Sequence, residues 1–503
     1  MLYVRRDGEA FMNQLYLGID IGTSSTKSIV IDGMGEVHGF GRAAYDNLNP
    51  QTGWVEQDPD VWYQAVVDSV REALGKVQDS RSIAGIGMTG QMHGLVMLDA
   101  ELKPLAPAVL WPDLRAADEV QSIKREYGNR LFELIGGPIA TGFLLVSFLW
   151  MKRNRPDIYS KIHVVLTPKD YIRLRLTGEV AMDPSDACGT GAFLPAVSQW
   201  AVDLLEDLGL DPEVFPRIIR SSAVAGMLLS GAADALGLQE GIPVATGCGD
   251  LQASAMGIGI INSGQLLVNV GTGGQVFQLL DRYAFDPNGR LHTMLHADGK
   301  SWHVMGAILA AGLSMSWISR IMEIQGVNGI SSLFASSADV IACQEDLYFL
   351  PYLVGERTPH MNERLTASFW GLRAEQGKEH LFRAVVEGVA FALRDCYDVL
   401  STLTEKPTVI RAGSGGLKDK YFRQTVADVF GMPVEYTDQS ETSSFGAALL
   451  AQAGVTGEDL DELIGRSVKT AGVIEPDMNR HRVYEEGFQR YRQLAQVTTE
   501  IGS

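Results

Sequence analysis

A short pattern occurs twice in this chain, 249 residues apart. Residues 19–24 have the sequence I-D-I-G-T-S, and residues 268–273 have the sequence V-N-V-G-T-G. Each copy lies within a stretch of alternating apolar and small residues, at 15–32 and 266–276, which predicts a β-hairpin with a turn of glycines and hydroxyls. The repeat therefore predicts two related halves, each beginning with a hairpin of the same kind.

The turn of the first hairpin, which we expect at residues 22–27, is suited to bind phosphate. Its backbone N–H groups can point at an anion together with the side chains of Thr23, Ser24 and Lys27, and the carboxylate of Asp20 lies beside them. Hairpins with small turn residues are also common as purely structural elements. The local sequence leaves both interpretations open.

Composition limits the ligands and partners. The chain has 503 residues, of which 46% are hydrophobic and 20% charged, a balance typical of a soluble globular protein. The formal net charge is −19 and no stripe of Lys and Arg is evident, which argues against nucleic-acid binding. A phosphorylated ligand would have to be held by backbone donors, helix N-termini and a divalent metal.

The sequence also predicts a cytoplasmic protein that does not enter a membrane. Four scattered cysteines without a CxxC pair fit a reducing compartment. Residues 1–12 contain no apolar core of a signal peptide and are interpreted as a short tail. The most apolar stretch, residues 139–151, is too short to span a bilayer.

Two nucleotide-binding motifs occur by chance resemblance only. Gly85, Gly87 and Gly90 form a literal GxGxxG, but no amphipathic helix follows them, so a dinucleotide site is rejected. Gly299-Lys300-Ser301 ends like a P-loop, but Met294 occupies the position of the required upstream glycine. Neither stretch predicts a phosphate site.

Asp250 is a candidate functional carboxylate. It follows an apolar strand and Gly247-Cys248-Gly249, and small residues after it begin a helix that extends towards Gly259. Asp250 could be an ordinary helix N-cap. It could equally be a carboxylate at a strand-to-helix corner, where α/β folds place their chemistry and where glycines let other atoms come close. The local sequence does not separate the two interpretations.

Several helices can be predicted from the pattern of apolar and capping residues. The expected ranges include a capped helix from Pro59, a small-residue helix at 306–321, a long helix at 380–400, a helix at 421–430 ended by Gly431, and a helix at 444–454 with a small face suited to pack on a sheet.

Taken together, the motifs resemble the FGGY family of carbohydrate kinases and, within it, the xylulose kinases. The resemblance extends from about residue 16 to about residue 454. The stretches that carry it are D-I-G-T-S-S-T-K at 20–27, W-V-E-Q-D-P at 54–59, G-Q-M-H-G at 90–94, L-T-P-K-D-Y at 166–171, G-C-G-D at 247–250, V-G-T-G-G at 270–274, G-E-R-T-P-H at 355–360, G-S-G-G-L-K at 413–418 and F-G-A-A at 445–448.

The resemblance implies an α/β protein with the duplicated actin-like ATPase (ribonuclease H-like) fold. Two domains would enclose a central ligand cleft: residues 12–262 as the sugar-binding domain and residues 263–503 as the ATP-binding domain. The implied activity is ATP-dependent phosphorylation of a ketopentose, most simply D-xylulose to D-xylulose 5-phosphate, with Mg²⁺ as cofactor. A homodimer is compatible with the sequence, which does not set the oligomeric state.

The resemblance also assigns roles to individual residues. Asp20 would act on the Mg–phosphate group and Asp250 would be the catalytic base, both near the metal. Gln91, Met92 and His93 would contact the sugar, although a histidine in a strand can also be simply half-buried and hydrogen-bonded. The ATP contacts would come from Thr23, Ser24, Lys27, Gly271, Thr272, Gly273, Gly415 and Gly416.

Two departures from the family pattern affect the substrate. Leu251 follows Asp250 where xylulose kinases usually have an asparagine that touches the sugar, and residues 146–150 lack the usual lysine. A kinase for a different ketose or polyol is therefore the alternative within the family. Outside the family, one alternative is an actin-like structural or chaperone ATPase, against which G-Q-M-H-G and Asp250 argue. The other is a sugar-binding regulator that has lost catalysis, against which the intact Asp20 and Asp250 argue.

Overall fold

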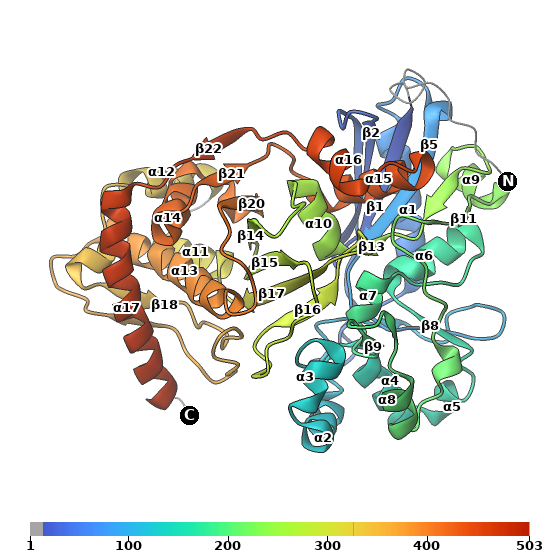
Figure 1. Ribbon diagram of the computed structural model, residues 1–503, viewed down its shortest axis with the longest axis horizontal. Coiled ribbons are helices and arrows are strands. Elements are labelled where there is room, and N and C mark those ends of the chain that lie inside the picture. Colours follow the sequence, from blue (N-terminus) through green and yellow to red (C-terminus); the bar gives the residue numbers. More distant parts are fainter. Residues whose placement is uncertain (1–13, 325, 502–503) are drawn as a thin grey trace.

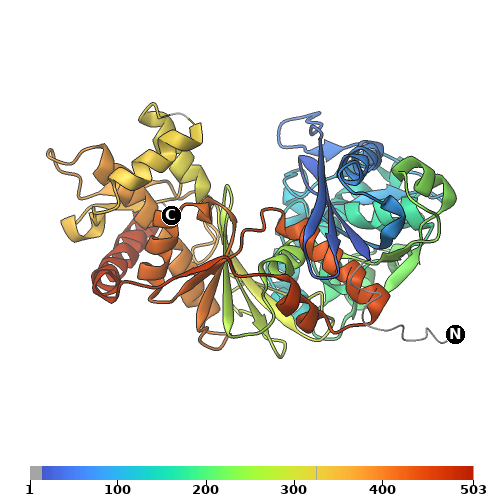
Figure 2. The ribbon, with the colours of Figure 1, turned by 90° about the horizontal axis from the view of Figure 1, so that it is seen from above.

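The computed structural model describes residues 14–324 and 326–501, so the tail predicted at residues 1–12 lies outside the described residues. Two lobes are each built around a mixed β-sheet (Figures 1 and 2). The first sheet contains β1 (Leu15–Ile21), β2 (Ser25–Asp32), β3 (Val37–Ala44), β5 (Ile83–Gly90), β11 (Val224–Met227), β12 (Pro243–Ala245) and β13 (Cys248–Gly249). The second contains β14 (Gln265–Val270), β15 (Gly274–Leu280), β16 (His292–Leu295), β17 (Trp302–Ile308), β20 (Val409–Gly415), β21 (Val434–Tyr436) and β22 (Gly472–Ile474).

The two sheets share one topology. The first has the order β3-β2-β1-β5-β12-β11 and the second the order β17-β15-β14-β20-β21-β22, with β16 added beyond β17. Along both paths the five strand pairs are antiparallel, antiparallel, parallel, parallel and antiparallel. The hairpin repeat in the sequence thus corresponds to a duplicated α/β unit in the structure, and the predicted fold is confirmed.

Helices flank both sheets and the loops carry four small two-stranded sheets. The helices are α1 (Pro59–Leu74), α2 (Ala117–Tyr127), α3 (Arg130–Ile135), α4 (Leu144–Asn154), α5 (Pro156–Tyr159), α6 (Pro168–Thr177), α7 (Pro184–Cys188), α8 (Val202–Asp207), α9 (Ser230–Leu236), α10 (Asp250–Ile258), α11 (Gly312–Ile321), α12 (Gly326–Ser336), α13 (Lys378–Leu400), α14 (Lys420–Phe430), α15 (Thr442–Thr456), α16 (Leu460–Ser467) and α17 (Met478–Ile501). The small sheets pair β4 (Glu56–Gln57) with β7 (Ala108–Val109), β6 (Val96–Leu98) with β8 (Val164–Leu166), β9 (Phe193–Leu194) with β10 (Gln199–Trp200), and β18 (Tyr348–Leu350) with β19 (Ser368–Trp370).

Helix boundaries follow the predicted caps, with one correction. The side chain of Asp58 caps α1, and Gly431 ends α14 in the left-handed conformation. The small-residue helix expected at 306–321 begins only at Gly312, because residues 306–308 belong to β17. That strand pairs along its whole length with β15, and such pairing outweighs the local preference of small residues.

Helix α15 comes from the C-terminal part of the sequence but packs on the first sheet, against β1 and β5 (Figure 2). It replaces side-chain packing by close backbone contact: a Cβ added at Gly87 would lie 1.8 Å from the carbonyl oxygen of Ala447. All seven residues of β1 are buried, as expected for a strand that is covered on both faces. Gly85 and Gly87 of the rejected GxGxxG motif therefore let helix α15 pack closely on the sheet, whereas Gly90 lies against Ile21 and Lys169.

Substituting Gly87 tests this contact. Gly87→Ala is expected to destabilise the protein by at least about 1 to 3 kcal/mol, because the added methyl group can only be accommodated by moving α15. Gly231→Ala in α9 is the matched control, since a Cβ there meets no atom within 4 Å and alanine favours helix. Thermal unfolding of the two variants checks the expectation, and equal melting temperatures would contradict it.

Candidate active site

The two hairpins contribute equivalent residue pairs to one cavity. In the first hairpin Asp20 lies opposite Lys27, in the second residue pair from the turn, and in the second hairpin Asn269 lies opposite Gln275 in the same position. All four residues line a cavity of about 190 Å³, together with Asp250, Leu251 and Ser254 of α10 and residues 440–443 before and at the start of α15. The repeat therefore places a charged pair and a neutral amide pair in the same site.

The structure shortens the turn that the sequence predicted at residues 22–27. Strand β2 already begins at Ser25, because residues 25 and 26 pair with β3 on one side while β1 flanks the strand on the other. Lys27 is therefore a strand residue, and its ammonium group forms an ion pair of 2.7 Å with Glu441. Sequence reasoning missed Glu441, since no local pattern links positions 27 and 441.

Asp20 is a buried carboxylate at the wall of the cavity. It is 8% exposed, and its Oδ1 has no hydrogen-bond partner among the described residues. Burial raises the pKa of Asp20 to about 6; the ammonium group of Lys27 acts in the opposite direction, and Glu441 adds to the increase. An acceptor oxygen with no donor is available here for a cation or a donor on a ligand.

Asp250 is the first residue of α10, and Gly249 occupies the N-cap position. The structure thus argues against the interpretation of Asp250 as an ordinary N-cap and places its carboxylate on the cavity that Asp20 also lines. Burial raises the pKa of Asp250 to about 7, and the neighbouring charge of Asp20 contributes to the increase. A carboxylate of this pKa is suited to exchange protons near neutral pH.

The corner before α10 has a fixed backbone. Gly247 has a φ angle of 89°, in the left-handed region, and a Cβ there would lie 2.2 Å from the carbonyl oxygen of Met88. The following strand β13 pairs in parallel with the end of β5. The glycines noted in the sequence therefore bring the N-terminus of α10 directly against the first sheet.

His93 lies between a backbone acceptor and an aromatic ring. Its Nδ1 is 2.5 Å from the carbonyl oxygen of Gly189, and its ring stacks on Phe143 with a centroid distance of 4.2 Å. Burial lowers the pKa of His93 to about 4, against the opposing effect of the Gly189 carbonyl. The neutral ring thus donates through Nδ1, which leaves Nε2 as an acceptor for a hydroxyl group. Phe143 was not predicted as a site residue.

Met92 and Gln91 have different positions. A Cβ added at Gly249 would lie 2.7 Å from the sulfur of Met92, so this side chain packs against the residue before Asp250. Gln91 is 1% exposed and donates to Gln57 at 3.2 Å, and Gln57 donates to the carbonyl oxygen of Thr23 at 2.7 Å. Gln91 is therefore buried and linked through Gln57 to the turn of the first hairpin, and its contact with the sugar remains a prediction.

The other predicted ATP contacts lie in turns outside the lining of this cavity. Thr23 accepts a hydrogen bond from the Trp111 indole at 3.0 Å, and Ser24 is exposed in the same turn. The carbonyl oxygens of Gly271 and Thr272 accept from the first N–H groups of α11, and Gly273 completes that turn. Gly415 ends β20 and Gly416 begins a 3₁₀ turn that leads to α14. Their roles towards ATP remain predictions.

The residues present fit a magnesium ion that arrives with a nucleotide. Within the described part of the chain no group of three or more His, Cys, Asp or Glu side chains is arranged to hold a metal. Mg²⁺ is commonly bound by one or two carboxylates together with substrate phosphates and water. Asp20 and Asp250 supply two such carboxylates on one cavity, and a cation between them would relieve the repulsion that adds to the effect of burial on the pKa of Asp250.

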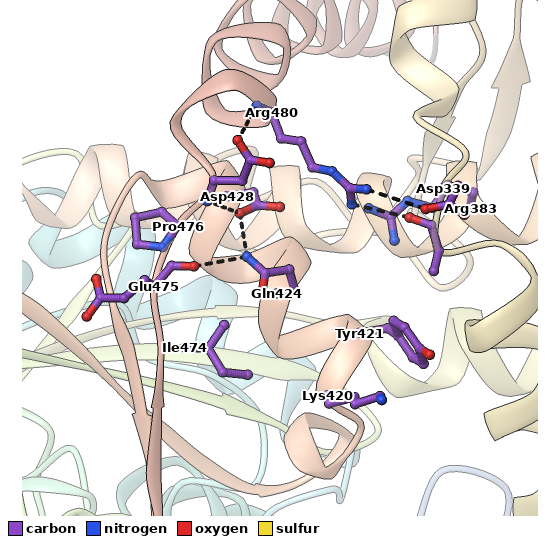
Figure 3. Close-up of a pocket in the computed structure, with 12 residues that line it drawn as sticks. Asp339, Arg383, Lys420, Tyr421, Gln424, Asp428, Ile474, Glu475, Pro476 and Arg480 are labelled. Atoms are coloured by element: carbon purple, nitrogen blue, oxygen red, sulfur yellow. Dashed lines mark hydrogen bonds and ion pairs between the residues drawn. The ribbon is translucent and has the colours of Figure 1, made fainter.

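A second cavity, of about 590 Å³, lies beside α14 (Figure 3). In this cavity Gln424 donates to Asp428 at 2.8 Å and to the carbonyl oxygen of Glu475 at 3.0 Å, while Arg480 donates to the carbonyl oxygen of Ala338 at 3.2 Å. None of the residues predicted for the site lines it. The paired carboxylates identify the smaller cavity between the hairpins as the candidate active site.

Two equivalent hairpins around one cavity, with a carboxylate on the first and another at the start of a helix, define a phosphotransferase site on a duplicated ATPase fold. Comparison with protein families agrees. Residues 15–257 match the N-terminal domain, and residues 266–455 the C-terminal domain, of the FGGY family of carbohydrate kinases. The chain belongs to this family and is an ATP-dependent sugar kinase.

Individual relatives are similar over nearly their whole length. The chain is 34% identical to the xylulose kinase of Escherichia coli (strain K12) over 484 residues, 96% of this chain and 99% of the relative. A crystal structure described as a xyloylose kinase from Brucella ovis has a TM-score of 0.92 at 34% identity and covers 97% of this chain and 100% of its own. A gluconate kinase from Lactobacillus acidophilus has a TM-score of 0.91 at 27% identity, with 97% and 98% covered.

Proposed function

We propose that this protein phosphorylates D-xylulose at its terminal hydroxyl group to give D-xylulose 5-phosphate. The observation that carries the proposal is the position of Asp250, a carboxylate with a pKa of about 7 that shares a cavity with Asp20 between the two hairpins. Relatives described as xylulose kinases support the choice of sugar.

In the proposed mechanism Asp250 is the general base. Its carboxylate accepts the proton of the sugar hydroxyl while that oxygen bonds to the γ-phosphorus of ATP, and the bond from this phosphorus to the β,γ-bridging oxygen breaks to release ADP. Met92 and His93 hold the sugar, with Nε2 of His93 as hydroxyl acceptor. Most of the rate enhancement comes from positioning and from neutralising the phosphate charges.

The phosphates would be held by both hairpins. We propose the turn at Thr23 and Ser24, together with Lys27, on one side and Gly271, Thr272 and Gly273 on the other, with Gly415 and Gly416 against the adenosine. Asp20 and Asp250 would hold Mg²⁺, which supplies charge neutralisation for the triphosphate when bound. Three carboxylates and one ion-paired lysine surround the cavity, so the side chains there supply no net positive charge for the phosphates.

The broader setting is proposed on the same basis. Residues 12–262 form the sugar-binding domain and residues 263–503 the ATP-binding domain, apart from α15, which packs on the first sheet; residues 12–13 and 502–503 lie outside the described residues. No described helix is long and apolar enough to cross a membrane. A cytoplasmic location would give access to ATP and would keep the four buried, free cysteines reduced. A homodimer remains a prediction, to be checked by light scattering.

Leu251 is the observation that favours a second candidate, a kinase for another ketose or a polyol. It lines the cavity beside Asp250 and belongs to the same apolar cluster as Met92, so it presents no hydrogen-bonding group there. A substrate hydroxyl left unpaired costs roughly 1 to 3 kcal/mol. ADP release across a panel of ketoses, aldoses and polyols distinguishes the two candidates, and the first fails if another sugar exceeds D-xylulose tenfold in kcat/KM.

Restoring an amide at this position gives a sharper test. Leu251→Asn is expected to lower KM for D-xylulose, by about tenfold for each 1.4 kcal/mol regained, with little change in kcat because such a contact binds ground and transition states alike. Leu251→Ala is the control, since it shortens the side chain without adding a donor. If the asparagine variant uses D-xylulose less well than the alanine variant, the pocket is shaped for a different sugar.

A further inference from the structure

Five charged side chains form a fully buried cluster next to the candidate active site. Lys169, Asp170, Arg173, Asp183 and Asp186 are each 0% exposed. The ammonium group of Lys169 lies 2.6 Å from Asp170, 3.2 Å from Asp183 and 3.7 Å from Asp186, and Arg173 also pairs with Asp170. Burying charges is costly even when they are paired, so such a cluster is poor evidence for stability alone.

The cluster is bonded to the corner that carries Asp250. Lys169 and Arg173 donate to the carbonyl oxygen of Thr246 at 3.5 and 3.3 Å, which holds the start of the corner. On the other side, the backbone N–H of Gly249 donates to the hydroxyl oxygen of Ser185 at 3.2 Å. Both ends of the segment before Asp250 are therefore fixed by groups that belong to the cluster or adjoin it.

Ser185 connects the buried charged cluster directly to the corner before Asp250. Its hydroxyl donates to Oδ2 of Asp183 at 2.6 Å, and its oxygen accepts from Gly249, the N-cap of α10. Because Asp183 itself caps α7 and pairs with Lys169, the hydroxyl is held in one orientation. The buried charges thereby fix the residue that precedes the base.

The opposite end of α7 contacts the sugar side. The carbonyl oxygen of Gly189, which follows α7, accepts from Nδ1 of His93, and a Cβ at Gly189 would lie 2.9 Å from the terminal methyl group of Met92. One short helix of five residues is therefore bonded near its N-terminal end to Gly249, the residue before the proposed base, and the residue that follows its C-terminal end contacts the proposed sugar residues.

We propose that α7 is a positioning element that sets the distance between sugar and base, and that Ser185 is a positioning residue for Asp250. This inference rests on the proposed function, in which Asp250 is the base. Misplacing a reacting group by about 1 Å can cost about 10²-fold in rate, so a single hydrogen bond to the N-cap can affect turnover.

Ser185→Ala tests the proposal, with Ser221→Ala as matched control. Both hydroxyls are buried and both donate to Oδ2 of Asp183, at 2.6 and 2.9 Å, but only Ser185 also accepts from Gly249. The carbonyl oxygen of Ser221, which accepts from Gly247, is unchanged by the substitution. We expect Ser185→Ala to lower kcat at least about tenfold with KM for ATP within about twofold of wild type, and Ser221→Ala to keep kcat within about twofold.

Several outcomes are decisive. Equal kcat values for the two variants, at comparable melting temperatures, would overturn the proposal, because the link to Gly249 would then have no effect. Loss of activity in both, in proportion to lost stability, would assign the cluster a structural role only. Asp250→Asn, measured in parallel, separates failure of the proposed function from failure of the positioning role. Full activity of Asp250→Asn refutes the proposed function. An inactive Asp250→Asn together with equal kcat values for the two serine variants refutes only the positioning role.

Discussion

Asp250→Asn is expected to lower kcat for sugar phosphorylation by about 10²- to 10⁴-fold, the range attributed to general-base catalysis. The amide is nearly the same size as the carboxylate but cannot accept the hydroxyl proton, so ATP and sugar should still bind. The measurement is steady-state ADP release with D-xylulose and Mg-ATP. Wild-type turnover in this variant would mean that the carboxylate contributes only to the structure of the corner.

The pH dependence of stability provides the control that the variant is folded. The pKa of Asp250 is raised from 3.8 to about 7 in the folded protein, so the wild-type carboxyl group favours folding below about pH 4 and loses this contribution as pH rises through 7. Asp250→Asn should therefore raise the melting temperature at pH 8, and the difference should vanish near pH 4. A destabilised variant at pH 8 would argue that lost activity reflects lost structure.

Removing divalent metal is expected to abolish turnover, and Asp20→Ala is expected to lower kcat at least about 10²-fold, since metal assistance is worth several kcal/mol. The reason lies in the charge of the cavity, where Lys27 is already paired with Glu441 and cannot neutralise a triphosphate alone. Turnover should be measured in EDTA and after addition of Mg²⁺. Full activity in EDTA would contradict this role for Asp20.

Sugar binding is the control for Asp20→Ala. Asp20 is on the first hairpin, whereas Met92 and His93 follow β5, so the Kd for D-xylulose should change much less than kcat. Calorimetric titration of the variant with D-xylulose checks this expectation. A loss of sugar affinity as large as the loss of turnover would place Asp20 in the sugar site, or show that the fold is disturbed.

Features encoded in short stretches could be predicted from the sequence. The glycine-flanked corner marks Asp250 only as a candidate carboxylate, because the local sequence leaves an ordinary N-cap equally open. The hairpin repeat, by contrast, predicts the duplicated fold, and the residues around Pro59 and Gly431 predict the start of α1 and the end of α14. Local patterns suffice in these cases because turn chemistry, capping and strand alternation depend on neighbouring residues.

Features that depend on distant residues could not be predicted in this way. The turn predicted at residues 22–27 includes Lys27, but pairing with the distant strand β3 extends β2 back to Ser25 and makes Lys27 a strand residue. Its ion-pair partner Glu441 also comes from another part of the chain. Asn269 occupies the position of Asp20 in the second hairpin, so the repeat itself held a signal for this site residue. The buried charges of α6 and α7 were invisible, since Lys169 and Asp183 each look ordinary on their own helix or cap.

The position of α15 has a consequence for biosynthesis. The face of β1 and β5 that α15 covers stays open until residue 456 has left the ribosome, although the strands themselves are made within the first hundred residues. A nascent chain that stops near residue 262 would expose a bare, partly glycine-lined sheet surface, which is prone to aggregation. The first lobe can thus complete its folding only after most of the second lobe has been synthesised. The cavity between the hairpins, which residues 440–443 also line, therefore forms late in folding.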